Sequence, residues 1–388
     1  MPRTLGPRTA PSWTTHPAVR LLIVLALLYV FMLGVNGLGD GFKSLGQGVL
    51  DSFFAATENP FTALMVGILA TTLVQSSSVT TSLIVALVAA PDNPLPIANA
   101  IPMVMGANIG TTVTNTVVAL AHMSRKEEFR RAFAVATCHD FFNYITVAVL
   151  LPLELMTGYL QRSATALAGL FTGFGGATYD SPIKGAIKAG IMPLKATIEA
   201  VTGGGQLGAI MLIVFSGFLI FVALLLLVRV MRKAMQMQVE GAVSRALERS
   251  ALLGMLVGVV VTVMVQSSSI TTSLLVPLAG AGLLTLTQAF PITIGANIGT
   301  TVTAFLAALA VTGANAEAAV IIALAHLLFN ISGTLLIYPI PKIRNIPLAA
   351  ARRLADVAVR SRKWALLYVV VLFYGLPALF AVLDQVLH

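Results

Sequence analysis

Two ten-residue stretches place a dense run of hydroxyl and amide side chains inside apolar tracts. They read VQSSSVTTSL at 74–83 and VQSSSITTSL at 265–274. A buried hydroxyl or amide is costly unless it pairs with another polar group, with open backbone or with a solvated ligand. The glutamine and hydroxyl oxygens suit a hard cation such as sodium. The serines favour helix N-caps, and a helix N-terminus suits an anion.

A second polar motif, GANIGTTVT, occurs identically at 106–114 and 295–303. We expect Asn108 and Asn297, flanked by glycines, to cap further broken helices. None of these motifs contains Arg or Lys, so an anion bound here needs cations brought with it. This favours cation-coupled anion transport, although a neutral solute would fit the same groups.

Asp140 is the only acidic residue well inside an expected membrane span, which makes it a functional candidate by default. We interpret Asp140 either as a cation ligand that carries coupling charge or as a residue that forms a hydrogen bond between helices. The second half of the chain has Leu327 at this place, so the acidic group occurs once.

Tyr368, near the end of the last span, fits an aromatic anchor at the interface or a deeper position.

CHDFFN at 138–143 is echoed by AHLLFN at 325–330. We interpret the recurring His139 and His326 as structural pairing residues. Asn143 and Asn330 follow one helical turn later on the same face. They either complete a cation site or lock neighbouring helices.

The chain has 388 residues, of which 57% are hydrophobic and only 10% charged. A soluble domain carries about 25% charged residues, so the composition indicates an integral membrane protein. The basic residues lie in short runs beside apolar segments, which argues against nucleic acid as a partner. Single tracts long enough to span a bilayer lie near 20–38, 97–120, 132–152, 207–231, 288–311, 317–340 and 364–386.

Two further tracts, at about 61–90 and 252–281, are broken by QSSS into pieces too short to cross alone. If both are re-entrant hairpins and the N-terminus is cytoplasmic, 19 of the 24 basic residues lie inside. If both tracts span, 14 lie inside and 10 outside. The positive-inside rule therefore favours hairpins, with the C-terminus outside.

The second half of the chain repeats the first, with the three motif pairs offset by 191, 189 and 187 residues. Three spans separate the QSSS motifs, so the halves enter the membrane from opposite faces, as in secondary transporters. We expect an all-α polytopic membrane protein with two inverted repeats, each with a re-entrant hairpin and discontinuous helices. The parts are a cytoplasmic tail (1–19), repeat 1 (20–152), an external loop (153–206), repeat 2 (207–340), and a basic cytoplasmic segment with the last span (341–388).

From Leu28 to Leu383 the sequence resembles the type II sodium-dependent phosphate cotransporters. The resemblance rests on both QSSS motifs, MGANIGTTVTNTVVAL, EFRRAFAVATCHDFFNYITVAVLLPLE and ALAHLLFNISGTLLIYPIP. It implies sodium-driven uptake of inorganic phosphate. In the family, an Asp at the position of Asp140, with alanines at Ala134 and Ala136, marks electrogenic members, so the resemblance implies an electrogenic transporter.

We therefore expect a sodium-coupled phosphate transporter, not an enzyme, with sodium as coupling ion and no other cofactor. It would lie in the cell membrane, the inner membrane if the source is bacterial. The candidate phosphate ligands are Ser76, Ser77, Ser78, Asn108, Thr111, Thr112, Ser267, Ser268 and Ser269. The candidate sodium ligands are Gln75, Gln266, Asn297, Thr300, Thr301, Thr303, Asp140, Asn143 and Asn330.

Three alternatives differ in what they predict. Another oxyanion, such as arsenate or sulfate, or proton coupling would leave the architecture unchanged. An ion channel would move thousands of ions per event. An intramembrane hydrolase using Ser, His139 and Asp140 is disfavoured, because adjacent His and Asp on a helix point about 100° apart and no GxSxG surrounds either QSSS.

Overall fold

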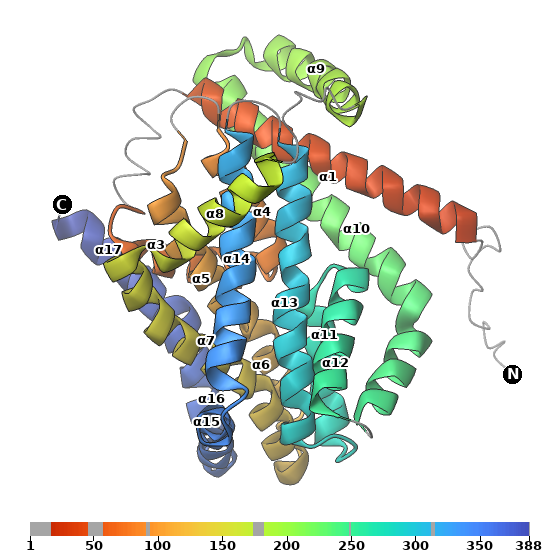
Figure 1. Ribbon diagram of the computed structural model, residues 1–388, viewed down its shortest axis with the longest axis vertical. Helices are drawn as coiled ribbons and strands as arrows, with labels where there is room; N and C mark the ends of the chain where they lie inside the picture. Colours follow the sequence, from red (N-terminus) through yellow and green to blue (C-terminus); the bar gives the residue numbers. More distant parts are fainter. Residues whose placement is uncertain are drawn as a thin grey trace, which may run out of the picture.

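The computed structural model is helical throughout the residues it describes (Figure 1). Within these ranges the chain forms helices and connecting turns, with no strand. The expected all-α class is confirmed, whereas residues 1–16 of the expected cytoplasmic tail lie outside the described part. The described ranges are 17–45, 57–90, 94–173, 182–247, 250–311 and 315–387.

Seven helical segments of this described part are long and apolar enough to cross a membrane, which confirms the seven expected spans. The last of them contains a six-residue π-helical turn, η2, between two α-helical pieces. The spans are α1 (Pro17–Leu45), α5 with α6 (Ile97–Thr111 and Val113–Leu120), α7 (Lys126–Thr157), α10 (Gly205–Leu247), α13 (Leu286–Ala310), α14 (Ala316–Ile337), and α16, η2 and α17 (Arg362–Val369, Val370–Gly375 and Leu376–Leu387).

The two tracts broken by QSSS each form a pair of short helices. The longest of the four has 15 residues, or about 22 Å, which is less than the roughly 30 Å of a bilayer core. In Figure 1 the α11 and α12 ribbons lie side by side. The pairs are α3 and α4 (Pro60–Val74 and Ser77–Val88) and α11 and α12 (Ala251–Val265 and Ser268–Gly280).

Glycines bring the first helix of each pair into backbone contact with a spanning helix. A Cβ on Gly106 of α5 would overlap the carbonyl oxygen of Leu64 in α3. A Cβ on Gly295 of α13 would overlap the carbonyl oxygen of Met255 in α11. The glycines of GANIG therefore allow close approach between two helices, at equivalent places in both halves.

The second helix of each pair reaches across to the other half of the chain. The helix α4 packs against α13 and α14, and α12 packs against α6 and α7. Figure 1 shows α13 and α14 running side by side through the middle of the molecule. The repeats are thus interlocked, so polar residues of both halves meet at the centre.

The segment expected as an external loop, 153–206, contains two helices, α8 (Tyr159–Gly173) and α9 (Pro182–Thr202). The buried carboxylate of Glu154 caps α8 by accepting from the backbone N–H groups of Leu160 and Gln161 at 2.5 and 3.2 Å. Residues 174–181 of the segment lie outside the described part. The expected basic segment after residue 340 forms one helix, α15 (Pro341–Arg360).

Candidate functional site

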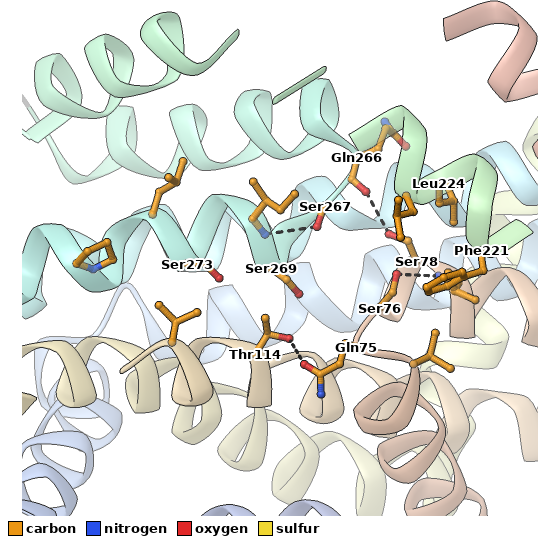
Figure 2. A pocket seen from close by; sticks show the side chains of 17 residues that line it. Gln75, Ser76, Ser78, Thr114, Phe221, Leu224, Gln266, Ser267, Ser269 and Ser273 are labelled. Atoms are coloured by element: carbon orange, nitrogen blue, oxygen red, sulfur yellow. Dashed lines mark hydrogen bonds between the residues drawn. The ribbon is translucent and has the colours of Figure 1, made fainter. Parts of the chain in front are cut away.

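A cavity of about 600 Å³ lies between the two QSSS motifs (Figure 2). The side chains of α10 form an apolar wall that includes Phe221 and Leu224. The polar residues come from α4, α6, α12 and the two breaks before α4 and α12. They are Gln75, Ser76, Ser78, Thr114, Gln266, Ser267, Ser269 and Ser273.

A left-handed glutamine creates each helix break. Gln75 and Gln266 both have φ of 58°, a conformation that non-glycine residues rarely adopt. The next serine is the N-cap: Ser76 Oγ accepts from the N–H of Val79 at 3.3 Å, and Ser267 Oγ accepts from the N–H of Ile270 at 3.4 Å. The N-caps expected from the serine runs are confirmed. Because both caps line the cavity, the positive ends of α4 and α12 both open towards it.

A threonine holds each glutamine side chain. Thr114 donates to Gln75 Oε1 at 2.9 Å, and Thr303 donates to Gln266 Oε1 at 3.0 Å. The two threonines are the last residues of the two GANIGTTVT motifs. Thr114 is absent from the sequence candidates, although its equivalence to Thr303 was a usable signal. Each amide group also donates from Nε2 to the backbone carbonyl three residues back, which fixes the direction of Oε1.

Ser78 joins the two motifs directly. Its Oγ lies 3.3 Å from Thr303 Oγ1 and 3.4 Å from the carbonyl oxygen of Gln266. The first QSSS therefore contacts the polar groups of the second repeat. The middle serines, Ser77 and Ser268, are buried first-turn residues that do not line the cavity.

The remaining motif residues lie away from the cavity in a buried polar cluster between the repeats. Asn297 accepts from His139 Nε2 at 2.6 Å through Oδ1, and it donates to Asn143 Oδ1 at 2.9 Å through Nδ2. On the other side, His326 Nε2 and Asn330 Nδ2 each lie 3.3 Å from Asn108 Oδ1. The histidine of each repeat thus pairs with the asparagine of the other, as the structural interpretation of the histidines predicts.

One hydrogen bond closes the cluster, and another extends it. Asn143 Nδ2 donates to the carbonyl oxygen of Asn108 at 3.1 Å. His139 Nδ1 lies 3.3 Å from Asn115 Nδ2. Asn115 Oδ1 accepts from Thr272 at 2.9 Å. Because His139 faces an acceptor at Nε2 and a donor at Nδ1, its partners define a neutral ring protonated at Nε2.

The two halves of the cluster are unequal. Ala304 stands where the first repeat has Asn115. His326 Nδ1 and Asn330 Oδ1 are buried and have no hydrogen-bond partner among the described residues. Asn143 and Asn330 both contribute to locking helices together, and Asn330 keeps one free acceptor.

The expected caps at Asn108 and Asn297 are wrong. Helix α13 runs unbroken through Asn297, and α5 continues past Asn108 to a break at Thr112. Asn108 Nδ2 instead donates to the carbonyl oxygen of Val104 within α5, at 2.9 Å. The flanking glycines serve contact between helices, so no helix end remains there to be capped.

The two threonines that directly follow each GANIG also lie away from the cavity; they are Thr111 and Thr112 in the first motif and Thr300 and Thr301 in the second. Thr111, Thr112 and Thr301 donate to carbonyl oxygens of their own helices at 2.7 to 2.8 Å. The hydroxyl of Thr300 is buried with no partner among the described residues. Within the repeat-2 motif, Thr303 reaches the cavity residues, through Gln266 and Ser78.

Asp140 is fully buried beside this cluster, on α7. Its Oδ2 accepts from the Tyr368 hydroxyl at 2.6 Å and lies 3.5 Å from Thr116 Oγ1. Its Oδ1 has no partner, and no ion pair to Asp140 occurs within the described ranges. A buried carboxylate in such surroundings needs a proton or a cation. The sequence singled out Asp140 but gave Tyr368 no specific role.

Comparisons with known proteins identify relatives of this chain. A model of the Na+/Pi-cotransporter family matches residues 30–178 and 219–345. The chain is 35% identical to the rat sodium-dependent phosphate transport protein 2A, over 93% of this chain and 67% of the relative. It is 32% identical to the human sodium-dependent phosphate transport protein 2B, over 92% of this chain and 64% of the relative. No solved structure matches the chain.

The family match covers both QSSS motifs, both GANIGTTVT motifs and Asp140. Between them, these residues build the cavity and the polar cluster between the repeats. The chain therefore belongs to the Na+/Pi-cotransporter family.

Proposed function

We propose that this chain takes up inorganic phosphate together with sodium ions, and that both bind in the cavity between the QSSS motifs. The observation that carries the proposal is that Ser76 and Ser267, the caps of α4 and α12, line one cavity. Two helix N-termini directed at one space favour an anion. The relatives are named as sodium-dependent phosphate transport proteins. The protein acts as a transporter in the cell membrane and not as an enzyme.

Phosphate binds through the serines that line the cavity and the free N–H groups of the first turns of α4 and α12. Ser77 and Ser268 contribute backbone rather than side chains, because both are buried off the cavity. Asn108, Thr111 and Thr112 act indirectly, by fixing the packing of α5 behind the site.

Sodium binds beside the phosphate at oxygens of the two glutamine–threonine pairs. Each Gln Oε1 accepts one hydrogen bond, from Thr114 or Thr303, and keeps acceptor capacity for a hard cation. Bringing cations with the anion offsets its charge in a site that has no Arg or Lys among its lining residues. A further sodium ion uses Asp140 Oδ1, and it makes the transport electrogenic.

The two helix pairs form re-entrant hairpins of opposite orientation, and transport proceeds by alternating access between the inverted repeats. The short helices and the equivalent contacts in the two halves support this topology. The charge distribution then places the N-terminus inside and the C-terminus outside. Asn297, Asn143 and Asn330 hold the repeats together near Asp140, whereas Thr301 bonds a carbonyl oxygen of its own helix. Asn330 Oδ1 and Thr300 Oγ1 have no hydrogen-bond partner among the described residues, so both keep acceptor capacity for a cation.

The test is uptake of labelled phosphate into proteoliposomes of the purified protein, with and without an inward sodium gradient. Replacing sodium by choline should abolish uptake, and excess sulfate should not compete. Ser76→Ala and Ser267→Ala should each reduce uptake strongly. Ser82→Ala is the matched control, because it lies on α4 but off the cavity. Full uptake in choline would refute sodium coupling, and competition by sulfate or arsenate would broaden the substrate to other oxyanions.

A further inference from the structure

A second cavity, of about 390 Å³, lies between α7, α15 and the turn from α12 to α13. Three arginines line it: Arg130 and Arg131 on α7 and Arg352 on α15. Its other walls combine apolar side chains with the two hydroxyls of Thr285 and Thr287. It shares no lining residue with the cavity between the QSSS motifs.

The arginines differ in how far their charges are already used. Arg130 pairs with Asp356, with 2.6 Å between Nε and Oδ1. Arg131 donates through Nη2 to the carbonyl oxygen of Gly280, at the end of α12, at 2.6 Å. Arg352 is exposed and forms no ion pair among the described residues. Asp356 and, at 4.0 Å, Glu127 both pair with Arg130, whereas Arg131 and Arg352 form no ion pair among the described residues, so the cavity keeps a surplus of positive charge.

The helix that supplies Arg352 is amphipathic. One side, with Pro347, Leu348, Ala351, Ala355 and Ala358, is buried where α15 packs on α7, and Arg352 and Arg353 are exposed. Figure 1 shows α15 at one end of the molecule. In the proposed topology this end faces the cytoplasm, where arginine-rich pockets between membrane helices suit anionic headgroups.

We propose that this cavity, which we call the basic cavity, binds a phosphate-bearing anion at the cytoplasmic surface. Guanidinium groups match phosphate oxygens. The Thr287 hydroxyl adds a polar contact, whereas the Thr285 hydroxyl is engaged with Gln288 at the start of α13. Two sources carry this group: a phospholipid headgroup, or phosphate in solution. The apolar wall made by Ala134, Val135 and Leu284 favours the phospholipid, because it offers contact to the first carbons of an acyl chain. Only the cytoplasmic placement rests on the proposed function; the binding itself does not depend on transport.

The experiment titrates the purified protein in mild detergent with phosphatidylglycerol or phosphatidylcholine and measures bound lipid by native mass spectrometry. Phosphatidylglycerol should bind more tightly than phosphatidylcholine. Arg352→Gln should weaken that binding about fivefold, from about 1 kcal/mol per basic residue near a membrane surface. Arg353→Gln is the matched control, because Arg353 is the next residue, exposed, and not part of the cavity wall.

A second arm adds inorganic phosphate in sodium-free buffer and asks whether it displaces phosphatidylglycerol. Phosphate binding that is lost in Arg352→Gln, with no preference between the lipids, would assign the basic cavity to phosphate in solution. Equal effects of Arg352→Gln and Arg353→Gln in both arms would overturn the proposal. Because neither arm measures uptake, a failure here leaves the proposed transport function unaffected, and the reverse also holds.

Discussion

The hydroxyl of Tyr368 donates to Asp140 Oδ2 at 2.6 Å, across 228 positions of sequence. This contact ties the last span to the centre of the first repeat. Among the described residues Asp140 Oδ1 has no hydrogen-bond partner, so this oxygen keeps acceptor capacity. The π-helical turn Val370–Gly375 begins two residues after Tyr368. Such turns often occur at functional positions.

Tyr368→Phe should weaken sodium activation of phosphate uptake, because Asp140 loses its shortest hydrogen bond. Leaving a buried polar group short of a partner costs about 1–3 kcal/mol. The measurement is the sodium concentration at half-maximal uptake, which should rise. Tyr374→Phe in the same span serves as the control. An unchanged sodium dependence in Tyr368→Phe would show that the contact is only structural.

Asp140→Gly should reduce or abolish the phosphate-induced current while some uptake of labelled phosphate remains. The carboxylate is the one acidic group well inside an expected span, so its removal deletes the proposed carrier of coupling charge. Current and uptake should be recorded on the same preparation. A mutant that keeps its full current would refute the role in charge coupling.

His139→Ala should destabilise the protein more than His326→Ala. His139 has partners at both ring nitrogens, whereas Nδ1 of His326 has none among the described residues. The extra lost hydrogen bond is worth about 1 kcal/mol, and the groups left unpaired add to it. The apparent melting temperature in one detergent should therefore fall further for His139→Ala. An equal or larger fall for His326→Ala would contradict the inequality of the two halves.

Thr114→Val and Thr303→Val should both weaken uptake, since each removes the donor that holds a cavity glutamine. Thr303→Val also removes a contact to Ser78, so its effect should be at least as large. We expect each to raise the sodium concentration at half-maximal uptake several-fold. Thr293→Val, on α13 but off the cavity, is the control. An effect of only one of the two threonines would show that the glutamines do not play equivalent parts.

Gly106→Ala should be strongly destabilising, by about 1–3 kcal/mol or more, because the added Cβ overlaps the backbone of α3. Gly217→Ala makes the same chemical change on α10 with no atom within 4 Å of the added Cβ. It should be neutral or stabilising, since alanine favours a helix over glycine by about 1 kcal/mol. Expression level and melting temperature should separate the two variants, and equal behaviour would contradict the proposed contact.

Local chemistry explains which features the sequence predicts. The caps at Ser76 and Ser267 follow from the preference of serine for that position, and the seven spans follow from apolar length. The expected breaks at Asn108 and Asn297 failed because glycine serves two purposes, turning a chain and allowing a neighbour close. Only the packed structure shows which one applies.

Contacts between distant segments set the limit of prediction. No periodicity around Tyr368 indicates that α16 approaches α7, so its bond to Asp140 could not be foreseen. The role of Thr114 can be predicted from the sequence, because the repeat aligns Thr114 with Thr303. The sequence repeat shows that Ala304 replaces Asn115 in the second half. That this substitution removes a hydrogen-bond partner of the histidine is seen only from the position of His139 in the structure.

The backbone contacts at Gly106 and Gly295 also limit how the protein deforms. Gly67 of α3 and Gly258 of α11 approach the backbone of the facing helix just as closely. Each of the two helix crossings therefore has a glycine on both helices. Neither α3 on α5 nor α11 on α13 has room to slide by a fraction of a residue. Each pair is therefore a single mechanical unit. Any large displacement within the membrane must therefore occur between these units, at the surfaces where Ser78, His139 and Asn297 make their contacts between the repeats.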